Sequence, residues 1–234
     1  MAEPGSRNPA AAGAVECSVA GERLFLLAER AVFWPARRTL FVADYRLGKA
    51  ASFRSAGIPL PSGTTSETVE RLERAVARTK AQRVVFLGDF LHSAAGRAPR
   101  TLARFALWRE KRRDLVLTLV RGNHDAHAGD PPEEWNLDVT DAGGRLGPFA
   151  LNHEPGAVRG AYALAGHIHP AVRLHGSGDA PVRLPCFWFG PRYGVLPAFG
   201  AFTGSAVVLP RHGDQVFVIA DDEVVQPPHE LDPK

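Results

Sequence analysis

Three short motifs in this sequence combine histidine with carboxylates or asparagine. They are Gly122-Asn123-His124-Asp125, Asn152-His153-Glu154-Pro155 and Gly166-His167-Ile168-His169. Two further carboxylates, Asp44 and Asp89, each come just after an apolar run as long as a β-strand. This mixture of oxygen and imidazole donors suits manganese, iron or zinc better than an all-sulfur or all-oxygen set would. The residues therefore predict a centre for a divalent metal ion.

Apolar runs of strand length must position these donors. Such runs occur at Leu24 to Leu27, Leu40 to Ala43, Val84 to Leu87, Leu115 to Val120, Phe149 to Leu151 and Tyr162 to Ala165. Several end in polar, glycine-rich tetrads, so the donors are expected at the carboxyl ends of strands. On an extended chain, alternation would place His167 and His169 on one side and turn Ile168 toward the core.

Helices are predicted between the strands. Thr64 and Glu67 fit a capping box, and the apolar residues from Val69 to Val76 repeat at the spacing of one buried helix face. A second helix is expected from Pro99 to Arg113. Strands and helices in alternation predict a layered α/β domain.

Beyond Val182 the pattern changes to short β-rich runs separated by glycine and proline. These runs are Leu184 to Phe189, Ala206 to Leu209 and Val216 to Ala220. They predict a second sheet that closes a sandwich. No Ser/Gly linker or internal repeat divides the chain, so residues 17–234 are expected to form a single domain after a flexible leader at 1–16.

The composition excludes some classes of protein. A chain of 234 residues with 45% hydrophobic content buries a core, which rules out a disordered or fibrous protein. The net charge of +3 permits nucleic-acid binding without requiring it. Cys17 and Cys186 are far apart, which fits a reducing compartment, and no run approaches the roughly 18 apolar residues of a membrane helix. We expect a cytoplasmic protein that does not associate with membranes.

The order of the motifs resembles that of a known superfamily. Asp44, Gly88-Asp89, Gly122-Asn123-His124-Asp125, His153 and Gly166-His167-Ile168-His169 look like the blocks of the calcineurin-like metallophosphoesterases. Leu47 to Arg54, Gly57-Ile58-Pro59, Gly63-Thr64-Thr65 and Leu196 to Gly204 are similar to the bacterial ligase-associated DNA damage response endonucleases (PdeM). The resemblance implies a four-layer α/β/β/α sandwich with mixed sheets, and one or two divalent ions, most simply manganese.

The resemblance also implies a role for each donor. Asp89 would bridge two metal ions. One site would be completed by Asn123, His153 and His167, and the other by Asp44, a histidine two residues after it, and His169. His124 would face the scissile phosphate as general acid, with Asp125 orienting its ring.

The sequence departs from this pattern at one ligand. Where the family has Asp-x-His, this chain has Asp44-Tyr45-Arg46. A guanidinium keeps its proton and offers only donors, so Arg46 cannot bind a metal ion. Arg46 either turns outward and leaves a weakened two-metal site, or occupies the vacant place and grips the phosphate, or marks an inactive enzyme. We favour the second outcome, because every other catalytic block is intact.

Candidates for substrate contacts lie near the motifs. Lys49 and Arg54 follow Asp44 closely and are expected to hold a nucleic-acid strand near the metal. His92, three residues after Asp89, either faces the phosphate or makes a structural hydrogen bond.

Two further features are open to a nucleic-acid or a structural interpretation. The basic stretch from Arg97 to Arg113 either follows a phosphate backbone or is a solubilising helix surface. Phe187, Trp188 and Tyr193 beside Arg192 either stack on unpaired bases or, for the first two, belong to a β-core.

The leading hypothesis is a manganese-dependent phosphodiesterase that cuts single-stranded or damaged DNA. The resemblance implies a DNA ligase, a helicase and a metallo-β-lactamase-fold exonuclease as partners. One alternative keeps the fold but changes the substrate to a small phosphoester. Another is a non-catalytic protein that binds nucleic acid or a repair partner, having lost one metal site through Arg46. Metal content and cleavage of a simple substrate distinguish these hypotheses.

Overall fold

The first sheet is built from the apolar runs of the first 140 residues. The computed structural model describes residues 13–55, 57, 64–174, 182–201 and 203–227. The strands follow chain order: β1 (Val15–Val19), β2 (Glu22–Leu27), β3 (Ala31–Trp34), β4 (Thr39–Ala43), β5 (Arg83–Leu87), β6 (Val116–Val120) and β7 (Leu137–Thr140). β1 to β4 pair antiparallel and β4 to β7 pair parallel. The carboxyl ends of β4, β5 and β6 therefore meet at one edge of the sheet.

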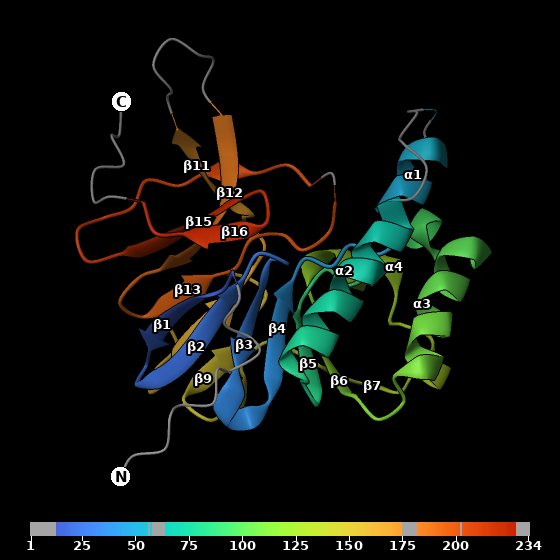
Figure 1. The fold of residues 1–234 in the computed structure, drawn as a ribbon. Helices are drawn as coiled ribbons and strands as arrows, with labels where there is room; N and C mark the ends of the chain where they lie inside the picture. Colours follow the sequence, from blue (N-terminus) through green and yellow to red (C-terminus); the bar gives the residue numbers. More distant parts are fainter. Residues whose placement is uncertain (1–12, 56, 58–63, 175–181, 202, 228–234) are drawn as a thin grey trace.

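Helices cover one face of this sheet. They are α1 (Lys49–Ser55), α2 (Thr64–Thr79), α3 (Pro99–Lys111) and α4 (Asn123–Ala128), with 3₁₀ turns η2 (Pro35–Arg37), η3 (Ala94–Arg97) and η4 (Glu133–Trp135). Val69 and Leu72 of α2 and Phe105 of α3 pack against the sheet, and both helices lie on the same side of it (Figure 1). The side chain of Thr64 lies outside the described residues, and Glu67 pairs with Arg71.

The second sheet contains the remaining strands. They are β8 (Gly144–Leu146), β9 (Phe149–Leu151), β10 (Tyr162–Ala165), β11 (Pro170–Leu174), β12 (Val182–Phe189), β13 (Tyr193–Val195), β14 (Ala206–Val207), β15 (Gln215–Ala220) and β16 (Glu223–Val225). β10 pairs parallel with β9 and β13, whereas β12 pairs antiparallel with β11, β13 and β15. The sheet is therefore mixed, and β9 and β10 have the bounds that the sequence predicts.

The two sheets pack face to face around an apolar core. Trp34 and Phe41 of the first sheet meet Phe149 of the second, with the Trp34 and Phe149 rings edge-to-face at 5.1 Å. The predicted α/β class with facing mixed sheets is thus confirmed. Among the described residues after Trp135 there are strands and loops but no helix, so the described part of the chain as a whole shows one helical layer and the two sheets.

The start of the domain differs slightly from the expected boundary. β1 begins at Val15, inside the segment assigned to a leader, because Cys17 and Val19 reach the inter-sheet core. Residues 1–12 lie outside the described part of the chain. No helix in the described part is long and apolar enough to cross a lipid bilayer.

The aromatic residues of β12 serve the core. Phe187 is fully buried between the sheets, so the β-core alternative is correct for this residue and the base-stacking alternative is wrong. Trp188 is half-buried, and its indole N–H donates to Asp214 Oδ2 at 2.9 Å. Its ring meets Tyr193 edge-to-face.

We expect Phe187→Ala to lower the free energy of unfolding by about 3–5 kcal/mol, the usual cost of a large cavity in a core. Urea denaturation measures this change. Leu209→Ala is the matched control, because Leu209 is exposed, and it should change stability by less than about 0.5 kcal/mol. A cost below about 1 kcal/mol for Phe187→Ala would contradict its place in the core.

Candidate metal and phosphoester site

The predicted donors meet where the two sheets adjoin. Asp44 follows β4, Asp89 follows β5, Asn123 opens α4 after β6, His153 follows β9, and His167 and His169 follow β10. The loop after β13 joins them, since Phe199 N–H donates to the Ala43 carbonyl. Segments from five strand ends therefore converge on one cluster.

The backbone of this cluster is strained. Left-handed φ angles of 50–72° occur at Asp44, Arg46, Asp89, His167 and His169. Such conformations cost residues other than glycine about 1–3 kcal/mol each, and they gather at functional sites.

The expected alternation of His167 and His169 along a strand is wrong. β10 ends at Ala165 and β11 begins at Pro170, so both histidines lie in a connecting turn. They reach one cluster through their left-handed backbones instead. Ile168 is half-buried and packs against the small cluster that contains Val172.

His153 lies at the centre of the donors. Its Nε2 is 2.9 Å from Asn123 Oδ1, 3.0 Å from His167 Nδ1 and 3.4 Å from Asp89 Oδ1. Its Nδ1 faces the Leu87 carbonyl at 3.1 Å and donates its proton there. With that proton on Nδ1, Nε2 presents a lone pair to the Asn123 amide oxygen, the Asp89 carboxylate and a ring nitrogen of His167.

These spacings fit a metal ion. A divalent ion bound at about 2.1 Å holds adjacent ligand atoms roughly 3.0–3.4 Å apart, in octahedral or tetrahedral geometry. Lone pairs that face one another repel unless a cation lies between them. The donor set of Asp89, Asn123, His153 and His167 therefore suits one divalent ion.

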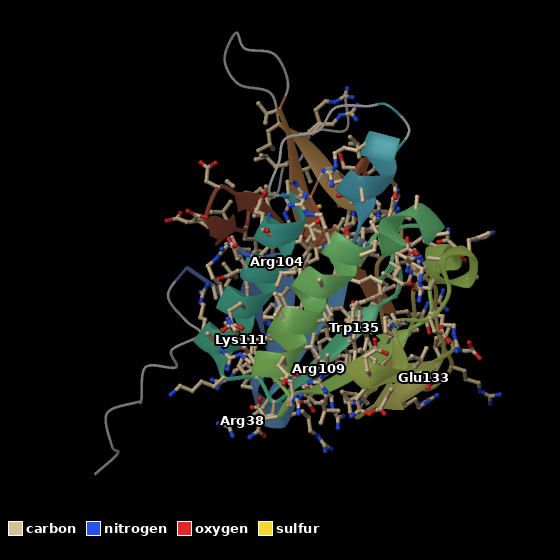
Figure 2. The ribbon with its side chains drawn as sticks, turned by 90° about the vertical axis from the view of Figure 1, so that its right-hand side faces the viewer. Arg38, Arg104, Arg109, Lys111, Glu133 and Trp135 are labelled. Atoms are coloured by element: carbon tan, nitrogen blue, oxygen red, sulfur yellow. The ribbon has the colours of Figure 1, made fainter. Side chains whose placement is uncertain are left out.

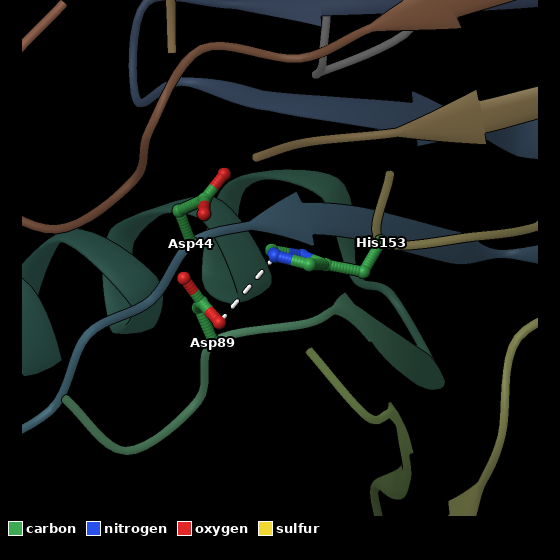
Figure 3. Close-up of side chains that lie close together, drawn as sticks. All are labelled: Asp44, Asp89 and His153. Carbon is green, nitrogen blue, oxygen red and sulfur yellow. Dashed lines mark ion pairs between the residues drawn. The ribbon is translucent and has the colours of Figure 1, made fainter. Parts of the chain in front are cut away.

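Asp44 adds a further carboxylate to the cluster. The ligand atoms of Asp44, Asp89 and His153 all lie within 4.8 Å of one another, and Figure 3 shows the three side chains converging. Asp44 Oδ2 accepts a hydrogen bond from the backbone N–H of His167 at 2.9 Å. Asp44 Oδ1 lies 3.1 Å from His169 Nε2. Burial raises the pKa of Asp44, but the bond to His169 and the nearby imidazoles outweigh burial and hold it below its ordinary value.

Two glycines allow the loops to come this close. A Cβ on Gly88, whose φ is +80°, would lie 2.1 Å from His153 Nδ1. A Cβ on Gly122 would lie 2.5 Å from Asp89 Oδ1. The glycines before Asp89 and Asn123 therefore leave room for the donors themselves.

Arg46 points into the cluster. Its Nη2 donates to Asp89 Oδ2 at 2.6 Å and lies 3.8 Å from Asp44 Oδ1 and 3.4 Å from His169 Nε2. The outward turn considered for Arg46 is therefore wrong. A second metal ion does not fit these residues, because a cationic donor sits among the three donors that would bind it.

His124 is oriented by a backbone carbonyl and not by Asp125. Its Nδ1 donates to the His92 carbonyl at 2.8 Å, which leaves Nε2 facing the cluster. Asp125 Oδ1 accepts the N–H groups of Phe90 and Leu91, and its Oδ2 accepts the Gly122 N–H. The predicted contact of Asp125 with the His124 ring is wrong, and Asp125 instead joins the loop after β5 to the start of α4.

The three candidates for substrate contacts differ in position. His92 stacks on His124 with ring centroids 5.3 Å apart, and its Nδ1 lies 3.4 Å from Arg46 Nη1. Burial, with the charges of Arg46 and Lys49, lowers the pKa of His92 to about 4. Lys49 is half-buried beside Arg46, whereas Arg54 is exposed on α1.

Most of the basic side chains between Arg97 and Arg113 make hydrogen bonds or ion pairs with other parts of the chain. Arg109 is buried and donates to the Trp135 and Leu115 carbonyls, and Figure 2 places its side chain near Trp135. The other contacts are Arg97 to the Asp130 carbonyl, Arg104 to Glu70, Arg112 to Glu73 and Arg113 to Glu110. The structural interpretation of this stretch is therefore better supported than a phosphate track.

Sequence reasoning does not find the backbone carbonyls that orient the imidazoles. They belong to Leu87, which faces His153, His92, which faces His124, and Gly204, which faces His169 at 2.8 Å. Every residue type has a carbonyl, so no residue identity marks these positions.

The fold and the donor cluster define a metallophosphoesterase, a hydrolase. A solved structure, the Pseudomonas putida nuclease MPE, is 40% identical to this chain with a TM-score of 0.81, and the match covers 91% of this chain and 100% of that one. The chain therefore belongs to the metallophosphoesterase family that includes this nuclease.

A second solved structure matches more weakly. The E. coli phosphoesterase YfcE is 17% identical with a TM-score of 0.37, over 79% of this chain and 88% of that one. No protein-family model matches the sequence, and no curated protein does.

We expect Gly88→Ala to abolish tight metal binding, because the added methyl group occupies the place of the His153 ring. Titration calorimetry with Mn²⁺ measures this loss. Gly21→Ala is the matched control: Gly21 has a similar φ of +78° but nothing within 4 Å of an added Cβ. Equal Mn²⁺ affinity in the two variants would show that His153 does not bind the ion.

The lowered pKa of Lys49 predicts that the affinity for anionic substrates depends on pH. Burial and the charge of Arg46 lower the pKa of Lys49 to about 8, although Asp44 opposes the shift. The ammonium is charged below that pH and neutral above it, so KM for a phosphodiester should rise between pH 7 and 9. Lys49→Arg should flatten this rise, since arginine stays charged. Parallel KM profiles for both proteins would exclude Lys49 from substrate binding.

Proposed function

We propose that this protein is a metal-dependent phosphodiesterase that cuts DNA internally, with single-stranded or damaged DNA as substrate. The observation that carries the proposal is the set of ligand atoms around His153 Nε2, together with His124 Nε2 at 4.0 Å from Asp89 Oδ2. The likeness to a nuclease at 40% identity supports the choice of nucleic acid over a small phosphoester.

The residues that would hold the ion are Asp89, Asn123, His153 and His167. A divalent ion at such a site supplies a nucleophile at neutral pH, because it lowers the pKa of water from 15.7 to about 7. Mixed nitrogen and oxygen donors suit manganese, iron or zinc, and the sequence resemblance favours manganese among them. Asp89 also fixes the reacting groups relative to one another, since its Oδ1 accepts the His124 backbone N–H at 3.0 Å.

His124 is placed to act as the general acid. Its Nδ1–H donates to the His92 carbonyl, so in the doubly protonated ring the Nε2 proton is the one that can pass to the leaving oxygen. The ring is about one-third exposed, which leaves room for a substrate beside it. A positioned acid contributes about 10²- to 10⁴-fold to the rate.

The setting of this activity is also a proposal. A DNA ligase, a helicase and an exonuclease of one repair system are the partners that the sequence resemblance suggests. A cytoplasmic location is supported by Cys17 and Cys186, which are both free and buried.

Variants of the cluster should separate metal binding from chemistry. Asn123→Ala and His167→Ala should lose both Mn²⁺ and cleavage, because each removes a ligand atom. His124→Ala should keep Mn²⁺ but lower kcat by about 10²- to 10⁴-fold. The measurements are metal analysis and cleavage of single-stranded DNA, because its alkoxide leaving group needs a proton whereas p-nitrophenolate leaves readily without one.

Circular single-stranded DNA tests the substrate, since a circle has no ends and only internal cleavage makes it linear. His212→Ala, at an exposed histidine outside the cluster, is the control and should match the wild type. A protein that hydrolyses the small diester bis-p-nitrophenyl phosphate but leaves the circle intact would favour the small-phosphoester alternative. Failure on both substrates with Mn²⁺ bound would refute the proposed activity.

A further inference from the structure

Arg46 occupies the space between the two buried carboxylates of the cluster. Its side chain is 9% exposed, and those of Asp44 and Asp89 are 0% exposed. Nη2 faces Asp89, Asp44 and His169 at 2.6, 3.8 and 3.4 Å. Nη1 faces the other way, 3.2 Å from His124 Nε2 and 3.4 Å from His92 Nδ1. The guanidinium thus bridges the carboxylates and the imidazole of the general acid.

The backbone holds Arg46 in this orientation. Its N–H donates to the Asp89 carbonyl at 2.8 Å, and the next N–H, of Leu47, donates to the Phe90 carbonyl at 2.8 Å. The neighbouring Tyr45 is fully buried and stacks on Phe90, with ring centroids 5.2 Å apart. Because Tyr45 is anchored in the core and the adjacent backbone is hydrogen-bonded, Arg46 is directed into the site.

The charges explain why the guanidinium stays there. Two carboxylates removed from water require a nearby cation, and Arg46 provides a permanent one. A divalent ion placed among Asp44, Asp89 and His169 would meet this fixed positive charge at contact distance and be repelled. The donors around His153 face Asp89 Oδ1, whereas Arg46 contacts the other oxygen, Oδ2, so the guanidinium does not stand between them.

We propose that this chain is a one-metal phosphoesterase in which the Arg46 guanidinium takes the place of a second ion. Nη2 anchors the group to the carboxylates, and Nη1 binds a phosphate oxygen beside His124. This inference rests on the proposed function, since it assigns a role within the same site. Hydrogen bonds of 3.2–3.4 Å from Nη1 to imidazole nitrogens are long, and an anionic phosphate oxygen is a stronger acceptor.

Metal stoichiometry tests the proposal without any substrate. The purified chain is saturated with MnCl₂, freed of excess ion and analysed for manganese per chain. We expect one ion in the wild type and two in Arg46→His, whose imidazole removes the charge and adds a ligand. Electron paramagnetic resonance should show an isolated Mn²⁺ in the wild type and an exchange-coupled pair in Arg46→His.

Two further variants make the test specific. Arg46→Lys keeps the positive charge and should still bind one ion. Arg23→His is the matched control, because Arg23 is 60% exposed on β2, far along the chain from the donors, and it should also bind one ion.

Several results would overturn the inference. Two ions in the wild type, or a single ion in a folded Arg46→His, would show that Arg46 does not replace an ion. If Arg46→His does not fold, as judged by circular dichroism, the wild-type stoichiometry and the Arg46→Lys result decide. Binding of no ion by the wild type would refute the proposed function as well, whereas two ions with full activity would refute the role of Arg46 alone.

Discussion

The site depends on the burial of two carboxylates, Asp44 and Asp89, at the junction of two sheets. Removing a carboxylate from water is costly unless cations and hydrogen bonds replace the lost solvent. Arg46 compensates one side of the pair, and on the other side the donors around His153 leave a place for a divalent ion. A neutral side chain at position 46 would leave this pair without its fixed cation. The charge of Arg46 is thus part of what allows the cluster to form.

Hydrogen bonds in the rest of the site hold these charged side chains in position. Asp125 accepts three backbone N–H groups and so joins the loop that carries Asp89 to the helix that carries His124. Backbone carbonyls fix which nitrogen of each imidazole faces the cluster. The strain of the left-handed residues is offset by the large core on both faces of the first sheet, which stabilises the strands that hold them.

Much of the fold was predictable, because buried strands leave a plain apolar signal. β9 and β10 have the predicted bounds, and the donors follow strand ends as expected. The turn around His167 was not predictable, because Asp and His adopt left-handed conformations more often than most residues but still only in a minority of positions. The ion pairs of the arginines in and just after α3 were not predictable either. Their partners Glu70 and Glu73 lie on α2 and are brought close only by tertiary packing. Identity of a donor is therefore readable from sequence, but its orientation is not.

Replacing a metal ligand by arginine keeps part of the positive charge of the site even though it removes coordination. A divalent ion carries two positive charges and exchanges with solvent, whereas a guanidinium carries one and is covalently attached. A single fixed charge stabilises a developing phosphorane less than an ion would, so a lower rate is expected from a site of this kind. In return, only one ion must be acquired, and the geometry on the Arg46 side is set by folding alone. Arginine at a ligand position is therefore compatible with an active site whenever its guanidinium reaches the carboxylates that the ion would have bridged.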